Sequence, residues 1–481
     1  MVFSSLYFIF IFLPVVCILY YLLKLTFPNH IGVRNGFLCI ASLFFYAWGE
    51  PIYILLMISS ILFNYLFALK KNKALFILAI VFNLAFLLVF KYTGFFIQNI
   101  NFVLAKFLPE TQIPIPHLEL PIGISFYTFQ ALSYIIDVYR GKVEKQKNIL
   151  NLALYICLFP QLIAGPIVRY IDIEKEITTR KENFSQFIDG LKDFCRGLGA
   201  KVIIANNMAF FVDGVYGKLD GAICPIVWLC ALCYMFQIYF DFSGYSRMAI
   251  GLGKMFGFTF PENFKYPYCA SSVTDFWRRW HISLSSWFRD YVYIPMGGNR
   301  NGIARHIFNI LFTWLLTGFW HGASWNFVFW GLYYGILLVF EKYASLKLIN
   351  SCTEHQLDFT AGFLKFLHRL FTLFIILFGW ILFRVENLPQ LGTVLSRMFT
   401  STSTIKAFVD YLTGNADLCS KLVFLIPAII FSFPLYPAIF KKSGSNTAIH
   451  VIELIVDLAI FAASLFLLVG STYNPFIYFR F

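Results

Sequence analysis

The chain has 481 residues, of which 59% are hydrophobic, 20% aromatic and 13% charged. Soluble domains carry about 25% charged residues, so a soluble enzyme, a disordered chain and a basic nucleic-acid binder are all excluded. The composition predicts a multi-pass protein of the lipid bilayer. Its net charge of +13 is expected in loops on the cytoplasmic side of the membrane.

The N-terminal part of the chain alternates apolar runs with basic clusters. The run Leu6–Leu23 is long enough to cross a bilayer and lacks the basic start and small-residue cleavage site of a signal peptide. It is therefore predicted to stay in the membrane. Further spans are predicted over Gly36–Trp48, Ile52–Leu69, Ala74–Phe90 and Leu120–Val138. The basic residues that follow alternate spans then lie on one side, which we take as the cytoplasm.

The next segment departs from this regular pattern. Leu150–Val168 is apolar but contains Pro160 and Pro166, which predicts a broken or re-entrant element covered by protein or water. Gly199–Val215 is then predicted to run outward and Ile226–Phe240 to return. The polar stretch Asp241–Arg247 either ends that helix or contributes to a polar cavity.

The C-terminal part predicts five more spans: Ile303–Trp320, Trp325–Phe340, Leu370–Phe383, Leu422–Phe440 and His450–Gly470. Glu386–Leu418 is predicted to be an outer loop, and the chain after Gly470 is predicted to lie outside. The aromatic C-terminus, Tyr473–Phe481, is expected to anchor in the membrane interface. Residues 1–481 are thus predicted to form a single all-α membrane domain of about 12 spans with a re-entrant element.

Ionisable residues in or beside apolar segments mark functional sites in membrane proteins. Tyr266–Arg300 mixes acidic, basic and histidine side chains with tryptophan and phenylalanine. One interpretation is an amphipathic anchoring helix at the interface. The other is a polar wall around a ligand, which His281 favours because histidine titrates near neutral pH.

A second such place is Thr317–Trp330, where His321 lies between two apolar runs. It is either an interfacial residue or a general base at the bottom of a cavity. Gly318 and Gly322 allow close approach of a substrate or another helix, and Asn326 is a candidate to orient a reacting group. One predicted span separates His281, near the inner side, from His321, in the outer half. That arrangement suits a group handed across the membrane.

The presence or absence of known sequence motifs indicates which reactions this protein can catalyse. The sequence contains no HExxH, Walker A, GxGxxG or GxSxG motif, so metal, nucleotide and serine-hydrolase chemistry are not expected. Four stretches instead carry a specific resemblance: PIGISFYTFQALSYIIDVYRG at 121–141, FPQLIAGPIVRY at 159–170, YPYCASSVTDFWRRWHISLSSWFRDYVYIPMGGNR at 266–300 and LTGFWHGASWNFVFWGLYYG at 316–335. Through them the chain resembles the membrane-bound O-acyltransferase superfamily. It is most similar to the bacterial branch that acetylates polysaccharides or D-alanylates teichoic acids, and the signature core is about 121–335.

The resemblance implies a ring of about 12 transmembrane helices, with re-entrant segments, around a central funnel or tunnel in the bacterial inner membrane. It implies that His321 is the catalytic histidine and that His281 occupies the second signature position, beside the donor carbonyl or the oxyanion. Substrate or donor binding is predicted for Arg278, Arg279, Trp280, Ser283, Arg289, Asp290 and Asn326. The arginines are candidates to meet the donor's phosphates.

The resemblance also implies the reaction partners. The donor is acetyl-CoA or another thioester carrier that enters from the cytoplasm, and no bound cofactor or metal is expected. The acceptor is an extracytoplasmic polysaccharide such as alginate or peptidoglycan, served by a separate secreted or membrane-tethered acetyltransferase of the SGNH type. Three alternatives stay open: D-alanyl transfer to teichoic acid, a transporter, and a scaffold for the secreted transferase.

Overall fold

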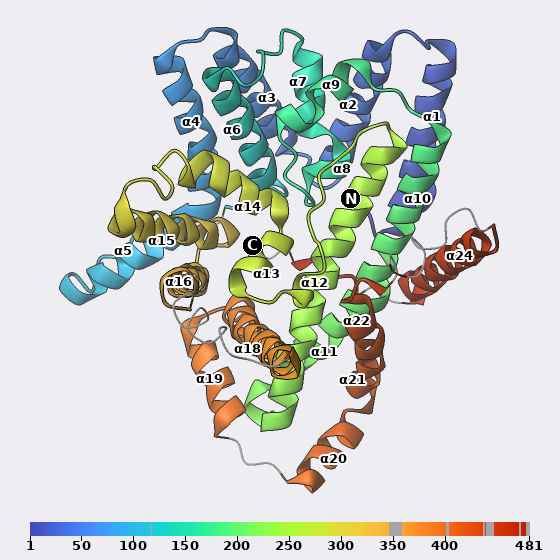
Figure 1. The fold of residues 1–481 in the computed structure, drawn as a ribbon. Helices are drawn as coiled ribbons and strands as arrows, with labels where there is room; N and C mark the ends of the chain where they lie inside the picture. Colours follow the sequence, from blue (N-terminus) through green and yellow to red (C-terminus); the bar gives the residue numbers. More distant parts are fainter. Residues whose placement is uncertain are drawn as a thin grey trace. The chain divides into compact units, whose positions relative to one another are not determined.

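The computed structural model describes residues 1–116, 118–345, 358–400, 404–435, 438, 447–470 and 473–477. These residues form helices and contain no strand, which confirms the all-α prediction (Figure 1). The first helices are α1 (Leu13–Thr26), α2 (Ile31–Ala47), α3 (Ile54–Leu69), α4 (Lys73–Leu87), α5 (Thr93–Phe107), α6 (Ile124–Arg140), α7 (Ile149–Cys157), α8 (Phe159–Leu162), α9 (Tyr170–Thr179) and α10 (Phe184–Gly199).

The remaining helices are α11 (Asn206–Tyr216), α12 (Cys224–Met255), α13 (Val273–Arg279), α14 (Ile282–Phe288), α15 (Gly302–His321), α16 (Trp325–Phe340), α18 (Asp358–Arg384), α19 (Leu388–Phe399), α20 (Ile405–Gly414), α21 (Ala416–Ser420), α22 (Leu425–Phe431) and α24 (Thr447–Gly470). Short π-helical segments join α4 to α5 and α10 to α11. Each joined pair is therefore one long helix, of 35 and 33 residues.

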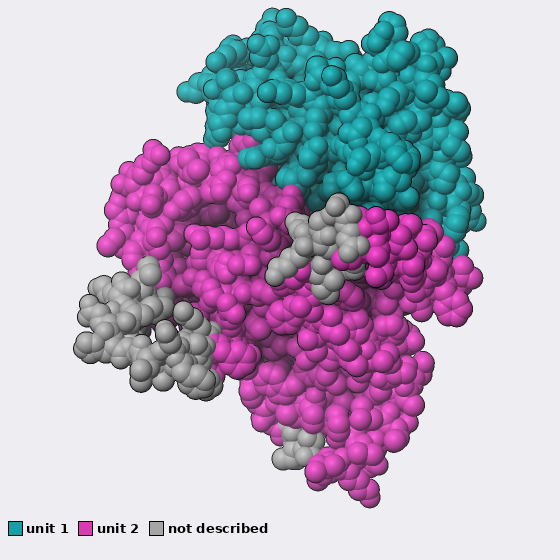
Figure 2. Space-filling model, turned by 45° about the vertical axis from the view of Figure 1, so that its right-hand side comes forward, with its two compact units in different colours: residues 1–194, 246–261 teal, residues 195–245, 262–481 magenta. Residues whose placement is uncertain are grey.

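The chain folds into two compact units (Figure 2). Unit 1 contains residues 1–194 and 246–261, and unit 2 contains residues 195–245 and 262–481. Helices α10 and α12 each contribute residues to both units. The single domain expected over the whole chain stays a prediction.

Six helices among the described residues are long and apolar enough to cross a membrane, or seven if the bent pair Ile405–Gly414 and Ala416–Phe431 forms one span. The predicted count of about 12 is not confirmed. Two of the predicted spans, α2 and α3, have 17 and 16 residues, whereas a span needs about 20. Several apolar helices nevertheless mark a multi-pass membrane protein.

The break predicted within Leu150–Val168 is confirmed. The helical hydrogen bonding of α7 ends at Leu158, whose ψ of 113° is outside the helical region, and Pro160 lies in the first turn of the four-residue α8. Ala164, Ile167 and Val168 in the irregular chain that follows are at most 1% exposed. Protein therefore covers the backbone of this segment, as irregular structure in an apolar environment requires.

The stretch Asp241–Arg247 does not end a helix, because α12 continues to Met255. Gly244 lies within the helix, where an added Cβ would come within 2.8 Å of the Gly197 carbonyl oxygen. Here glycine allows two helix backbones to approach closely, rather than ending a helix. Asp241 instead forms a buried ion pair with Lys201, at 2.6 Å.

Most of the segment predicted as an outer loop, Glu386–Leu418, is helical, and its placement on the outer side stays a prediction. It contains α19, α20 and the start of α21, while residues 401–403 lie outside the described part of the chain. Asn387 caps α19 and Thr404 caps α20 through their side chains.

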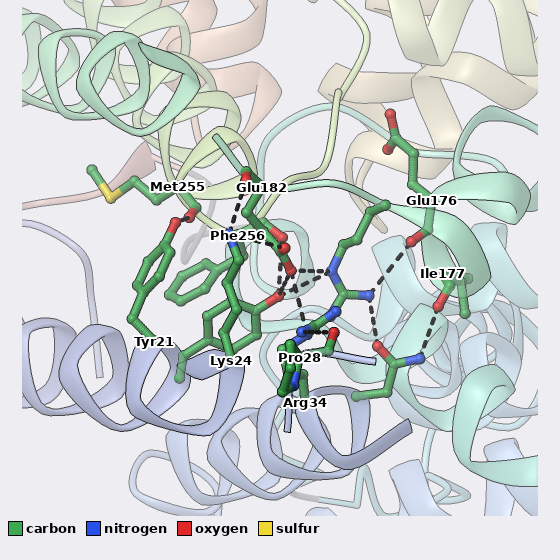
Figure 3. Close-up of polar contacts among 12 residues, drawn as sticks. Tyr21, Lys24, Pro28, Arg34, Glu176, Ile177, Glu182, Met255 and Phe256 are labelled. Carbon is green, nitrogen blue, oxygen red and sulfur yellow. Dashed lines mark hydrogen bonds and ion pairs between the residues drawn. The ribbon is translucent and has the colours of Figure 1, made fainter. Parts of the chain in front are cut away.

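Figure 3 shows a buried ion cluster in unit 1 that is centred on Glu182. Its carboxylate lies 3.5 Å from Lys24 Nζ, 3.5 Å from Arg34 Nε and 3.6 Å from Arg180 Nε. Burial acts to raise the pKa of Glu182, but a hydrogen bond from Tyr20 and the two guanidinium groups bring it below its ordinary value. The cluster therefore ties α1, α2 and the connection between α9 and α10 together.

Unit 2 contains an aromatic core that positions the candidate site. Its buried members include Trp277, Trp280, Trp330 and Trp380, drawn from α13, the α13–α14 junction, α16 and α18. Trp280 and Trp380 have ring centroids 4.6 Å apart, and Trp277 and Trp330 have theirs 5.5 Å apart. Aromatic pairs at these distances add to the stability that burial provides.

Candidate active site

The segment Tyr266–Arg300 is not one amphipathic helix. It forms the short helices α13 and α14 and a π-helical turn, and α13 ends at Arg279, just before His281. His281 has φ 44° and ψ 54°, a left-handed conformation that costs a non-glycine residue about 1–3 kcal/mol. Surrounding contacts must hold it there, and its side chain is only 1% exposed.

Asn263 provides the main polar contact to His281. Its side-chain oxygen accepts hydrogen bonds from the Ser283 backbone N–H at 3.2 Å and from the Ser283 hydroxyl at 2.8 Å. The same oxygen lies 3.2 Å from His281 Nδ1. Because a backbone N–H only donates, this Asn263 atom is an acceptor, and His281 Nδ1 must carry the proton. The lone pair of the imidazole is then on Nε2.

His281 is neutral near pH 7 in this environment. Burial lowers the pKa of His281 to about 3. Its ring lies edge-on to Phe242, with centroids 4.6 Å apart. A neutral imidazole with the proton fixed on Nδ1 accepts a hydrogen bond at Nε2 and does not donate one there.

His321 is the last residue of α15 and is 5% exposed. Three aromatic rings stand edge-on to its imidazole: Trp320 at 5.0 Å, Trp330 at 5.0 Å and Phe383 at 5.2 Å between centroids. Phe383 comes from the end of α18, more than sixty positions along the chain. The ring is thus enclosed mainly by aromatic side chains.

Glycines bring α16 against the end of α15. A Cβ added at Gly318 would lie 2.2 Å from the Phe327 carbonyl oxygen and 3.0 Å from the Gly331 Cα. A Cβ added at Gly322 would lie 2.2 Å from the Phe327 ring. Of the two uses predicted for these glycines, close approach of another helix is the one that the structure shows.

The two histidines share one neighbour in unit 2. The Trp320 ring centroid lies 6.0 Å from that of His281 and 5.0 Å from that of His321, so the imidazoles are at most about 11 Å apart. The two imidazoles are therefore close in space although the predicted span Ile303–Trp320 separates them in the sequence. Their expected placement in opposite halves of the bilayer stays a prediction.

Other predicted site residues have structural contacts. Trp280 is 3% exposed within the aromatic core, and Ser283 supports Asn263. Asn326 donates a 2.8 Å hydrogen bond to the Val385 carbonyl and accepts one from Ser324. Asn326 therefore ties the start of α16 to the end of α18, close to Phe383.

The predicted charged residues lie nearer the surface of unit 2. Arg279 pairs with Asp275 at 2.8 Å, and Arg289 pairs with its neighbour Asp290 at 2.7 Å. The Arg289 side chain is 60% exposed, and Arg278 is also exposed.

Sequence reasoning missed Asn263 and Phe383. Asn263 stands in the loop between α12 and α13, and a lone asparagine in a loop carries no signal of a histidine partner. Phe383 lies in an apolar run of α18 where any of several phenylalanines fits the pattern. Within the described residues no group of three His, Cys, Asp or Glu side chains is placed to hold a metal ion.

Comparison with known proteins assigns the family. Residues 142–383, which include both histidines, match the MBOAT, membrane-bound O-acyltransferase family. The probable alginate O-acetylase AlgI of Pseudomonas putida is 37% identical over 100% of both chains. The chain belongs to the membrane-bound O-acyltransferase family. It is therefore an O-acyltransferase, embedded in a membrane by several apolar helices.

Two further relatives are named for transfer of different acyl groups, and the similarity of this chain to each can be compared. The peptidoglycan O-acetyltransferase of Helicobacter pylori is 37% identical, over 83% of this chain and 80% of its own. The teichoic acid D-alanyltransferase of Bacillus subtilis is 31% identical, but over only 50% of this chain and 66% of its own. Similarity to the two O-acetylating relatives thus extends over more of the chain.

Proposed function

We propose that this O-acyltransferase moves an acetyl group from a cytoplasmic thioester, acetyl-CoA in the simplest case, across the membrane for the O-acetylation of an extracytoplasmic polysaccharide. Relatives named for alginate and peptidoglycan acetylation support acetyl as the group, and they support these two glycans as candidates. The proposal includes a bacterial inner-membrane location and the family's ring of helices around a tunnel. It also includes a separate SGNH-type partner that completes ester formation outside.

His321 is the general base of this proposal. The acceptor hydroxyl attacks the thioester carbonyl while the imidazole takes its proton, so a C–O bond forms. The C–S bond then breaks, and the leaving thiolate takes the proton back from the imidazolium. The products are an acetyl ester and a free thiol. A positioned base of this kind contributes about 10²–10⁴-fold to the rate.

The single observation that carries the proposal is the pair of buried imidazoles that both contact the ring of Trp320. With its proton on Nδ1, His281 accepts a hydrogen bond from an N–H or O–H of a substrate and so helps to orient it. The protonation state disfavours the expected donation to an oxyanion. Arg278, exposed on α13, is the arginine that we assign to the donor's phosphates.

The test is mass spectrometry of acyl groups released by base from purified surface glycans. Wild-type cells are compared with a deletion strain and with that strain complemented by the wild-type gene. Loss of acetate on deletion, with recovery on complementation, is the expected result, and the glycan fraction that changes names the acceptor. Loss of D-alanine instead of acetate would move the protein to the teichoic-acid branch and overturn the proposal.

A further inference from the structure

The end of α18 places an arginine next to the ring that packs against His321. Arg384 is the last residue of α18, and the preceding Phe383 stands edge-on to the His321 imidazole, with ring centroids 5.2 Å apart. Phe383 is 2% exposed. The last residues of a helix lack part of the intrahelical hydrogen bonding, so their position depends on side-chain contacts. The contacts that hold Arg384 therefore also hold Phe383 beside His321.

Arg384 is anchored inside unit 2 by one carboxylate and two aromatic rings. Its Nη2 donates a 2.7 Å hydrogen bond to Asp213 of α11, and its side chain is 9% exposed. The guanidinium carbon lies 4.3 Å from the ring centroid of Tyr216 and 5.9 Å from that of Tyr234. A carboxylate and aromatic faces are the partners that a buried guanidinium requires in place of water. Arg384 is thus fixed to α11 and α12.

The carboxylate that binds Arg384 is itself held in place. The Tyr473 hydroxyl donates a 2.6 Å hydrogen bond to Asp213 Oδ2, while Arg384 binds Oδ1. The Tyr473 ring in turn stands at 89° to the ring of Phe210, with centroids 5.7 Å apart. Because both of its oxygens are bound, the Asp213 carboxylate has a defined orientation toward Arg384.

A second polar contact fixes the residue that follows Arg384. The Asn326 side chain donates a 2.8 Å hydrogen bond to the Val385 carbonyl oxygen, which joins the start of α16 to the end of α18. The Phe383 ring packs on Phe327, with centroids 5.0 Å apart. Hydrogen bonds are directional, whereas apolar burial is not. We therefore expect the polar contacts at Arg384 and Val385 to determine where the Phe383 ring lies.

We infer that Arg384 and Asp213 are positioning residues for His321. Their ion pair fixes the end of α18, so that Phe383 covers one side of the His321 imidazole and keeps the ring in the orientation that takes the proton of the acceptor. The inference rests on the proposed function for the role of His321 as the base. A misplacement of about 1 Å in a reacting group can cost about 10²-fold in rate, so a distant anchor can control the reaction.

The experiment compares Arg384→Gln, Phe383→Ala and the double variant as purified full-length protein in nanodiscs. Acetyl transfer is followed as thiol released from acetyl-CoA, with membranes of the deletion strain as the source of the acceptor and of any partner protein. Each single variant should lower kcat about 10–100-fold, with the KM for acetyl-CoA changed by less than about twofold. Arg384→Lys keeps the charge and should retain more of kcat than Arg384→Gln.

The double variant tests whether Arg384 acts through Phe383. If it does, the double variant should be no slower than the slower single variant, because the second change removes nothing further. Asp213→Asn removes the charge of the partner and gives the same measurements if Arg384→Gln does not fold. A double variant whose loss equals the product of the two single losses would overturn the inference.

The matched control breaks another ion pair of unit 2. Arg196 binds Asp457 of α24 at 2.6 Å, and its side chain is 12% exposed, which is close to the burial of Arg384. Arg196→Gln should lower the unfolding temperature about as much as Arg384→Gln but leave kcat unchanged. Equal kcat in Arg196→Gln and Arg384→Gln would show that Arg384 acts only through stability, and would overturn the inference.

Chemical labelling separates this inference from the proposed function. His321 is 5% exposed, and its reaction with diethyl pyrocarbonate, mapped by mass spectrometry, reports how well the imidazole is covered without use of the activity. Labelling should be faster in Arg384→Gln and Phe383→Ala than in the wild type and Arg196→Gln. Unchanged labelling in Arg384→Gln would overturn the inference alone. Full activity of His321→Ala, with faster labelling in Arg384→Gln, would overturn the proposed base and leave the anchoring of Phe383 over His321 supported.

Discussion

The region around His281 and the region around His321 meet at the same tryptophan ring but are built from different chemistry. His281 is held by the amide oxygen of Asn263 in a strained left-handed conformation. His321 is enclosed by the edges of three aromatic rings at the end of a regular helix. A fixed hydrogen bond selects a protonation state at His281, whereas the aromatic rings give His321 an apolar enclosure. The two histidines therefore differ in their surroundings, and we expect them to have different roles in the reaction.

Removal of the His321 imidazole should have the largest effect. His321→Ala is expected to lower kcat for acetyl transfer by about 10²–10⁴-fold, because the hydroxyl loses its positioned base. The measurement is product formation by the purified protein at saturating acetyl-CoA, with the amount of folded protein matched by size-exclusion chromatography. Full activity at normal protein levels would show that His321 is not the base.

Removal of the Asn263 side-chain amide tests whether its hydrogen bond fixes the proton of His281 on Nδ1. Asn263→Ala leaves His281 Nδ1 without this acceptor, so the proton is free to move to Nε2 and kcat should fall about tenfold. Asn263→Asp keeps an oxygen and adds a negative charge, which should raise the pKa of His281 and shift the pH–rate profile to higher pH. If both variants lose the same activity with unchanged profiles, Asn263 acts only through folding.

Acid sensitivity should follow from the buried, neutral His281. Its pKa is about 3 in the folded protein against about 6.5 in an unfolded chain, so the unfolded state binds more protons between these values. Stability is therefore present above pH 6.5 and is lost as the pH falls toward 3, by about 2 kcal/mol between pH 7 and pH 5. Thermal unfolding of the wild type and His281→Gln at both pH values isolates this contribution. Equal losses in the two proteins would refute it.

The close packing of Gly318 against α16, near His321, can be tested through the stability of the protein. Gly318→Ala places a methyl group 2.2 Å from the Phe327 carbonyl oxygen, and overpacking costs about 1–3 kcal/mol, partly offset by the better helix propensity of alanine. Gly392→Ala is the matched control, because a Cβ there meets nothing within 4 Å. The unfolding temperature should fall only for Gly318→Ala. A fall of equal size in both variants would point to a general effect of the substitution.

The smallest effect is expected at the exposed arginine of α13. Arg278→Gln should raise the KM for acetyl-CoA by less than about fivefold, since an exposed ion pair contributes only about 0.2–1 kcal/mol. Donor titrations at low and high salt provide the measurement. A KM that does not change at low salt would remove Arg278 from the donor site.

Much of the local structure followed from the sequence. The apolar run Trp325–Phe340 forms a helix with the predicted bounds, and the break near Pro160 is confirmed. Apolar runs and chain-breaking prolines act on their immediate neighbours, so local pattern is sufficient for them. The predicted count of about 12 spans stays unconfirmed, because apolar composition alone does not separate a full crossing from a shorter buried helix.

The sequence by itself determined that this protein is an all-helical membrane O-acyltransferase with two histidines in its signature blocks. Only the tertiary structure decided that Trp320 contacts both imidazoles, that Asn263 fixes the proton on His281, and that α18 carries Phe383 to His321. Each of these contacts joins residues that different helices and loops bring together. Their geometry depends on how side chains fill the core, and that packing has no local signal along the chain.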